Sequence, residues 1–163
     1  MPVTHLRIDN RLIHGQVTVS WVGVLDANHL IVTNDEVAAD EMQRLILPQA
    51  ARGVKTSVLG VQDTIDYCTG ENAADERIMV IAKLPSDALA LVEGGVRPDE
   101  INVGNQAPRP ASKFTMVTRS IAVTAEDAKT FRAIADRGFT LHQRMMPTDR
   151  DHDFLRVLED KGL

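Results

Sequence analysis

The residues best suited to chemistry lie together near the start of the chain. The segment reads Arg7-Ile8-Asp9-Asn10-Arg11-Leu12-Ile13-His14-Gly15-Gln16-Val17. An imidazole nitrogen is nucleophilic near neutral pH without an activating base, so His14 is a candidate for carrying a phosphoryl group. The glycine that follows it favours a position in a loop between a strand and a helix. A histidine that only caps the helix or packs within the loop is the alternative.

Two neighbouring features could hold a phosphate beside His14. The amides of Gly15, Gln16 and Val17 should open a helix, and free amides at a helix N-terminus bind anions. Arg11 lies three residues before His14 and can place its planar guanidinium on two phosphate oxygens. A histidine, an arginine and free amides together predict a phosphohistidine site.

Three further polar residues could line the same site. Asp9 could orient the side chain of Arg11 or of His14, but it could equally form a turn with the residue that follows it. Asp35 and Asn105 follow the second and fifth expected strands. Because parallel strands end at one edge of a sheet, both side chains could reach the crevice that holds the histidine.

The pattern of apolar residues predicts the elements that must position these groups. Short apolar runs predict strands at residues 3–8, 30–33, 56–59, 78–82, 101–103, 121–123 and 139–141. Longer amphipathic runs predict helices at residues 15–25, 36–51, 61–68, 86–93, 125–137 and 151–161. This alternation predicts an α/β fold with an open, mostly parallel twisted sheet and helices on both faces. No linker interrupts the pattern, so residues 1–163 are expected to form a single domain.

Composition and charge exclude several classes of protein. The 163 residues are 44% hydrophobic and 25% charged, which is typical of a globular domain and not of a disordered chain. The net charge is −5, so general nucleic-acid binding is not expected. The one cysteine, Cys68, cannot form an intrachain disulfide, which fits a reducing cytoplasm. We find no signal peptide and no apolar run of the roughly 18 residues that span a membrane. We therefore expect a soluble cytoplasmic chain.

Patterns that would indicate a metal or a cofactor are weak. Asp149, Asp151 and Asp153 alternate as at the start of a calcium loop, but Phe154 stands where that loop needs a glycine. The five histidines do not have the spacing of a zinc site. The glycine patterns of nucleotide-binding loops are also absent from the sequence. We expect neither a metal nor a cofactor.

The segment around His14 and four later stretches resemble one known family. The later stretches are Asn34-Asp35-Glu36-Val37-Ala38, Leu91-Val92-Glu93-Gly94-Gly95-Val96, Ile101-Asn102-Val103-Gly104-Asn105 and Pro147-Thr148. In this order they are similar to the enzyme IIB component of the mannose/fructose/sorbose (N-acetylgalactosamine-like) family of the sugar phosphotransferase system. The resemblance covers nearly the whole chain and implies an open α/β sheet. The family often has an acidic residue where this chain has Asn10.

The resemblance implies a phosphocarrier subunit. In that family, the histidine at the position of His14 accepts a phosphoryl group from a phosphohistidine of a IIA protein. It passes the group to a sugar that enters through the membrane components IIC and IID. The chain would then be a protein-histidine to sugar phosphotransferase that docks at the inner face of the membrane. The sequence contains no IIA domain, so the expected phosphate donor is a separate IIA protein.

The sequence says less about the choice of sugar and about a rival class of function. The stretches at residues 21–23 and 34–36 slightly favour N-acetylgalactosamine as the sugar over mannose, fructose or sorbose. A non-catalytic regulatory or anion-binding module is the rival function, although such a module would not need the nucleophile His14. Arg7, Arg11 and Arg109 are expected to form a positive collar around the site that attracts an acidic face of IIA.

Overall fold

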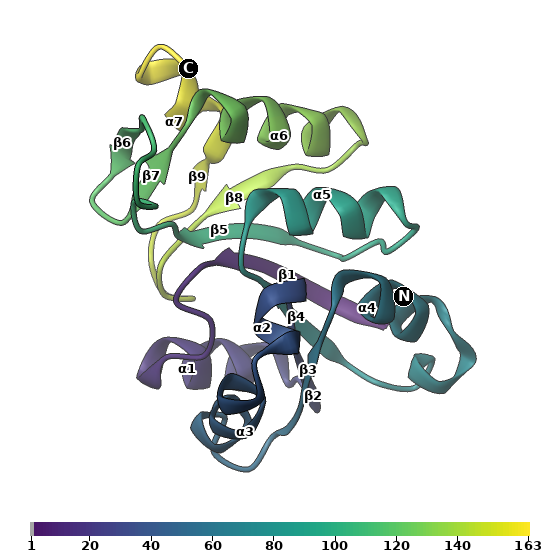
Figure 1. Cartoon of the computed structure of the whole chain (residues 1–163). Coiled ribbons are helices and arrows are strands. Elements are labelled where there is room, and N and C mark those ends of the chain that lie inside the picture. The colour runs from purple at the N-terminus through teal and green to yellow at the C-terminus, as the bar shows by residue number, and fades with distance from the viewer. Residues whose placement is uncertain (1) are drawn as a thin grey trace.

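A seven-stranded sheet runs through the middle of the protein, seen here in a computed structural model that describes residues 2–163 (Figure 1). The strands lie in the order β3 (Lys55–Leu59), β2 (His29–Thr33), β4 (Ile78–Ala82), β1 (Val3–Asp9), β5 (Ile101–Asn105), β8 (Leu141–Gln143) and β9 (His152–Asp153). Neighbouring strands are parallel except for the pair of β8 and β9. The predicted open, mostly parallel sheet is confirmed.

Helices cover both faces of this sheet, as predicted (Figure 1). On one face lie α1 (Gly15–Leu25) and α3 (Glu41–Ala50), whose Trp21 and Leu47 share a core cluster with β2 and β4. The other face is covered by α4 (Val61–Thr69), α5 (Pro85–Glu93), α6 (Ala125–Asp136) and α7 (Phe154–Asp160). All five residues of β4 are buried because the strand is covered from both sides, which explains its unbroken apolar run.

Two sequence predictions need correction. The helix expected over residues 36–51 is divided into α2 (Asp35–Ala39) and α3, because the Asp40 carboxylate accepts hydrogen bonds from Met42 N and Gln43 N at 3.0 and 3.2 Å. A short polar side chain that caps a new helix ends the preceding one. The run at residues 121–123 forms β7 (Ile121–Val123), but it pairs with β6 (Thr115–Thr118) in a separate hairpin and not with the main sheet.

The carboxyl end of β1 is the point where the direction of winding changes. From β1 the chain passes through α1 to β2, on the far side of β4, and later returns through α5 to β5 on the opposite side of β1. In open α/β sheets, the two crossovers leave a crevice at such a point, and ligands bind there. The loop that contains His14 begins at this end of β1.

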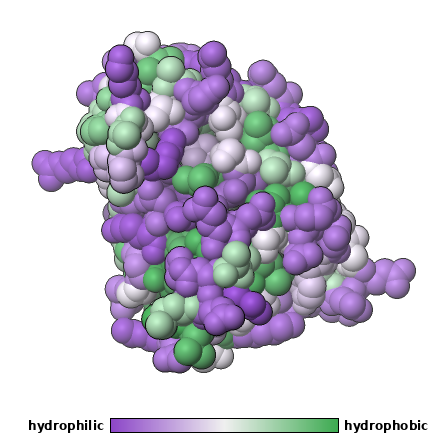
Figure 2. All heavy atoms as spheres, viewed as in Figure 1, coloured by the Kyte–Doolittle hydropathy of each residue, from purple (hydrophilic) through white to green (hydrophobic). Residues whose placement is uncertain are grey.

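Polar residues cover most of the face seen in Figure 2, with small groups of apolar atoms between them. The largest exposed apolar side chains on α3 are Met42, Leu45 and Ile46. None of the helices within residues 2–163 is both long and apolar enough to cross a membrane.

His5 is an unusual polar residue of the core. It is fully buried in β1, and in the described chain neither of its ring nitrogens has a hydrogen-bond partner. Its ring lies 4.6 Å from that of Trp21, and Glu100 Oε1 is 4.0 Å from Nδ1. Burial lowers the pKa of His5 to about 3, and the charges of Arg7 and Arg144 act in the same direction. The ring is therefore neutral in the folded state.

This burial predicts a loss of stability in acid. Between pH 6.5 and about 3, the unfolded chain binds a proton at His5 that the folded chain does not. The free energy of unfolding should therefore fall by about 1.4 kcal/mol for each pH unit below 6.5 through this group. The variant His5→Leu should lose that slope, which urea denaturation at pH 7, 6, 5 and 4 measures. The variant His152→Gln, at an exposed histidine, is the control and should keep it. An unchanged slope in His5→Leu would show that the folded state accommodates a charged His5.

Candidate functional site

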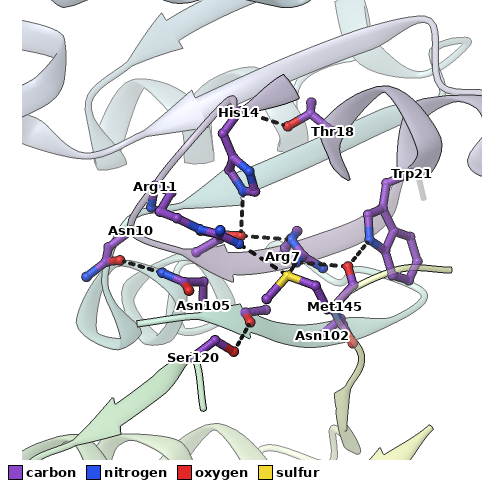
Figure 3. A network of polar contacts seen from close by, with 12 residues as sticks. Arg7, Asn10, Arg11, His14, Thr18, Trp21, Asn102, Asn105, Ser120 and Met145 are labelled. Atoms are coloured by element: carbon purple, nitrogen blue, oxygen red, sulfur yellow. Dashed lines mark hydrogen bonds and ion pairs between the residues drawn. The ribbon is translucent and has the colours of Figure 1, made fainter. Parts of the chain in front are cut away.

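Residues 10–14 connect β1 to α1 in a loop that is fixed by its own side chains. Leu12 and Ile13 are buried in the core beneath the loop, and Leu12 adopts a φ of 62° to turn the chain inward. The backbone N–H of His14 donates to Thr18 Oγ1 at 3.1 Å. His14 is thus the residue before the first turn of α1 (Figure 3). Its side chain is 21% exposed.

The imidazole of His14 is oriented by a buried carboxylate. Its Nε2 lies 3.1 Å from Asp9 Oδ2, and the Asp9 side chain has no exposed surface. Asp9 also accepts from Arg7 Nε at 3.2 Å and from the backbone N–H of Arg11 at 3.0 Å. Burial alone would raise the pKa of Asp9, but the hydrogen bond with His14 and the charge of Arg7 outweigh it and lower the pKa. Asp9 is therefore an ionised acceptor, and Nδ1 is the His14 nitrogen that points away from it.

Arg7 supports the site from inside the protein and is not part of a surface collar. Only 1% of it is exposed, so the predicted exposed position is wrong. Its guanidinium donates to Asp9 and to the carbonyl oxygens of Arg144 and Met145, both at 3.2 Å. A Cβ atom at Gly104 would lie 2.2 Å from Arg7 Nη2, so only a glycine leaves room for this side chain.

Met145 was missed by the sequence analysis, yet it contacts both arginines of the segment. Its carbonyl oxygen accepts from Trp21 Nε1 at 2.9 Å and from Arg7. Its Sδ lies 3.2 Å from Arg11 Nη2 (Figure 3). Met145 follows β8, which is brought to the site only because β8 pairs with β5. The local sequence gives no signal from which this contact could be predicted.

Arg11 is the more exposed cation of the site. Its side chain is 40% exposed, and its Nε lies 3.7 Å from Asp9 Oδ1. The buried Asn105 lies on the other side, where Nδ2 donates to Asn10 Oδ1 at 3.2 Å. Turning the Asn105 amide over would instead place its oxygen 3.3 Å from Arg11 Nε. The structure therefore brings Asn105 into the site, as the sequence analysis expected.

Asn10 ties the loop after β1 to the loop after β5. Its Nδ2 donates to Ala107 O at 3.1 Å, and its Oδ1 accepts from Ala107 N at 3.0 Å. An acidic residue here could accept a hydrogen bond but could not donate one. The asparagine of this chain therefore holds the two loops together through both atoms of its amide.

The side chains of Asp35 and Arg109 bind partners outside the site around His14. Asp35 Oδ1 accepts from the backbone N–H of Val61 at 2.8 Å, so Asp35 caps α4 and is not part of the crevice lining. Arg109 donates through Nη2 to both carboxylate oxygens of Asp127, at 2.9 and 3.0 Å. A positive collar of three arginines was predicted around the site. Arg7 is buried and cannot belong to it, and the charge of Arg109 is balanced by the Asp127 carboxylate.

The first turn of α1 presents amides beside His14. The backbone amides of Gly15, Gln16 and Val17 have no carbonyl four residues earlier in the helix to bind. Gly15 and Gln16 are exposed, and Gly15 adopts a φ of 52° that glycine reaches without strain. This end of the helix can accept an anion. Within residues 2–163, no group of three or more histidine, cysteine or acidic side chains could hold a metal ion.

The comparisons with known proteins identify the class of protein. The model of the PTS system sorbose subfamily IIB component matches residues 3–163, and the chain belongs to this family. It is 34% identical over 161 residues to the fructose-specific EIIB component of Bacillus subtilis, covering 98% of both proteins. It is 37% identical over 154 residues to the N-acetylgalactosamine-specific IIB component 2 of Escherichia coli, covering 93% of this chain and 96% of that protein.

A solved structure agrees in fold. The IIBSor domain of the sorbose permease of Klebsiella pneumoniae superposes with a TM-score of 0.92 at 32% identity, covering 98% of both chains. IIB components of this family are phosphotransferases that transfer phosphate to sugar, and they work with IIA proteins and with IIC and IID components. The chain is thus a IIB phosphotransferase of a sugar phosphotransferase system, as the sequence analysis expected.

The contact between Gly104 and Arg7 predicts a sharp effect of one methyl group. Gly104→Ala should displace the Arg7 guanidinium and lower the free energy of unfolding by about 1–3 kcal/mol, because the new atom overpacks a filled site. Urea denaturation measures this loss. Gly23→Ala is the control, since a Cβ at Gly23 meets nothing within 4 Å and should stabilise α1 by up to about 1 kcal/mol. Equal stability of Gly104→Ala and the wild type would mean that Arg7 moves without cost.

Proposed function

We propose that His14 carries the phosphoryl group on its Nδ1 atom. The observation that carries this proposal is the 3.1 Å contact between His14 Nε2 and the ionised Asp9. A carboxylate acceptor keeps the imidazole proton on Nε2, which leaves the lone pair of the neutral ring on Nδ1. In the first transfer, the N–P bond of the donor histidine breaks as a bond between Nδ1 and phosphorus forms. In the second transfer, a sugar hydroxyl oxygen attacks the phosphorus, an O–P bond forms, the bond to Nδ1 breaks, and the released Nδ1 can take up the hydroxyl proton.

The neighbouring groups are arranged to hold the phosphoryl oxygens. Arg11 contacts the Met145 thioether, which is a weak acceptor, and its Nε approaches Asp9 Oδ1 only to 3.7 Å, so its guanidinium can turn toward a phosphoryl group. The amides of Gly15, Gln16 and Val17 would bind the same oxygens from the helix end. The transfer from IIA exchanges one N–P bond for another, so in that step the protein mainly aligns the groups and stabilises charge. No metal ion or cofactor enters this mechanism.

The partners follow from the family. A separate IIA protein would supply the phosphoryl group, and the membrane components IIC and IID would present the sugar. The protein would act in the cytoplasm and at the inner face of the membrane when docked. The relatives are named for fructose, N-acetylgalactosamine and sorbose, so similarity alone does not select the sugar, and we attribute that choice to the membrane components.

Phosphorylation by a IIA protein tests the assignment of His14. The wild type should gain one acid-labile phosphate by mass spectrometry, and NMR of the product should find it on Nδ1. His14→Ala should gain none and should stay folded, because the side chain lies in a loop and leaves no core cavity. His152→Gln is the control at an exposed histidine and should be fully labelled. Full labelling of His14→Ala would refute the assignment, and no labelling of the wild type would favour an anion-binding module.

Arg11 should affect the rate of transfer more than stability. Arg11→Ala should slow phosphorylation of His14 on the order of a hundredfold, because one cation that stabilises the transferring group is lost. Arg11→Lys should recover part of the rate, since an ammonium lacks the planar fork of the guanidinium. Quenched-flow measurements give these rates. Arg44→Ala, at an exposed arginine of α3, is the control. A wild-type rate in Arg11→Ala would remove Arg11 from the mechanism.

A further inference from the structure

A crevice of about 510 Å³ opens beside Arg11 at the carboxyl edge of the sheet. Its volume lies within the range of about 300–1,000 Å³ that is usual for small-molecule sites. Segments that follow four different strands line it. The lining residues include Arg11 after β1, Glu36 in α2, Lys83 and Leu84 after β4, and Pro108 and Pro110 after β5.

The charged part of the crevice lining holds groups that are free to bind a ligand. Within the described residues, neither Lys83 nor Glu36 forms an ion pair. The backbone of Lys83 is nevertheless fixed, because Gln106 Nε2 donates to its carbonyl oxygen at 2.9 Å. Arg109 also lines the crevice, but Asp127 already occupies its guanidinium. Arg11 lies farther from its carboxylate, with Nε 3.7 Å from Asp9 Oδ1, and its Nη2 contacts only the Met145 thioether. The crevice therefore offers two cations, Arg11 and Lys83, and one carboxylate.

Part of the lining is apolar. Leu84, Pro108 and Pro110 contribute this part, and their side chains can offer neither a hydrogen bond nor a charge. A ligand that satisfies both kinds of lining needs an anionic group for the cations, hydroxyl donors for the carboxylate of Glu36, and an apolar face for the prolines. A sugar phosphate has all three, because a pyranose ring has a face of C–H groups and a rim of hydroxyls.

The carboxylate of Glu36 discriminates between this ligand and an acidic protein segment. An acidic peptide would also be attracted by Arg11 and Lys83, but Glu36 would repel its carboxylates at close range. Hydroxyl groups gain a hydrogen bond to Glu36 in place of that repulsion. The presence of one anion among the cations therefore favours a polyhydroxy ligand.

We propose that this crevice binds the phosphorylated sugar, with its phosphate at Arg11 and its ring between Glu36 and the prolines. The proposal rests on the phosphoryl-transfer function of His14, because the phosphorylated sugar is the product of that reaction. Arg11 also approaches Asp9, the residue that orients His14, so the phosphate would lie at the end of the crevice nearest the histidine. A bound sugar phosphate would then occupy the guanidinium that a new phosphoryl group requires, and accumulated product would slow the rephosphorylation of His14.

A titration of the full chain tests the site. ¹H–¹⁵N spectra would be recorded with mannose 6-phosphate, N-acetylgalactosamine 6-phosphate, fructose 1-phosphate, inorganic phosphate and free mannose. At least one sugar phosphate should shift the amides of Glu36, Lys83 and Ala107, and it should bind at least tenfold more tightly than inorganic phosphate or free sugar. The same sugar phosphate should slow labelling of His14 by a phosphorylated IIA protein. Equal affinity for inorganic phosphate and every sugar phosphate would overturn the proposal.

Paired variants separate the roles of the carboxylate and of the cation. Glu36→Gln should weaken the binding of sugar phosphate at least fivefold and should not weaken the binding of inorganic phosphate, whereas Lys83→Met should weaken both. Glu41→Gln and Lys113→Met remove the same charges at exposed positions outside the crevice and should change neither affinity. If Glu36→Gln binds sugar phosphate as the wild type does, the hydroxyl-binding role is wrong.

Labelling of wild-type His14, measured without sugar phosphate, distinguishes a failure of this proposal from a failure of the proposed function. If His14 is phosphorylated and no sugar phosphate shifts the crevice amides, the crevice proposal fails and the transfer function stands. If the IIA protein shifts those amides and sugar phosphates do not, the crevice belongs to the protein partner and the proposal is overturned. If sugar phosphates bind but His14 is never labelled, the transfer function fails, and with it the idea that the ligand is its product.

Discussion

The site depends on a carboxylate that is buried at the end of the central strand. Asp9 has no exposed surface, and such a charge is tolerated in a protein only when it is paired and hydrogen-bonded. Arg7 supplies the compensating charge from within the core, while His14 and the Arg11 backbone complete the hydrogen bonds. The same bonds that make the buried charge tolerable also fix the orientation of the imidazole. Stability and chemistry therefore rest on one group of atoms.

This arrangement needs a parallel sheet that changes direction at β1. Arg7 reaches the carbonyl oxygens of Arg144 and Met145 only because β8 lies next to β5, and β5 next to β1. Arg7 also needs the space left by Gly104 of β5. The loop with His14 is short and local, but the residues beneath it come from both ends of the chain. A strand-to-helix loop alone would supply the histidine without fixing its ring.

The sequence predicted the parts of the site that depend on local order. The strand, the loop and α1 follow from apolar periodicity, and His14 and Arg11 follow from their place between them. Arg7 was misplaced because its charge suggested a surface residue. In a central strand covered on both faces, however, no position is exposed, and the side chain had to be buried with a partner. Met145 could not be predicted, since its contact with Arg11 depends on strand order and not on spacing. The division at Asp40 has a sequence signal, because aspartate favours the position before a helix.

The close approach of Arg7 to position 104 also limits how such a chain can change over generations. With Arg7 in place, a Cβ atom at position 104 would clash with its guanidinium. If a smaller residue replaced Arg7 first, position 104 could acquire a side chain without a clash. The arginine could then not return by a single substitution, because the space it occupied would be filled. The order in which the two positions change therefore matters, because a side chain at position 104 would fill the space from which Arg7 reaches Asp9.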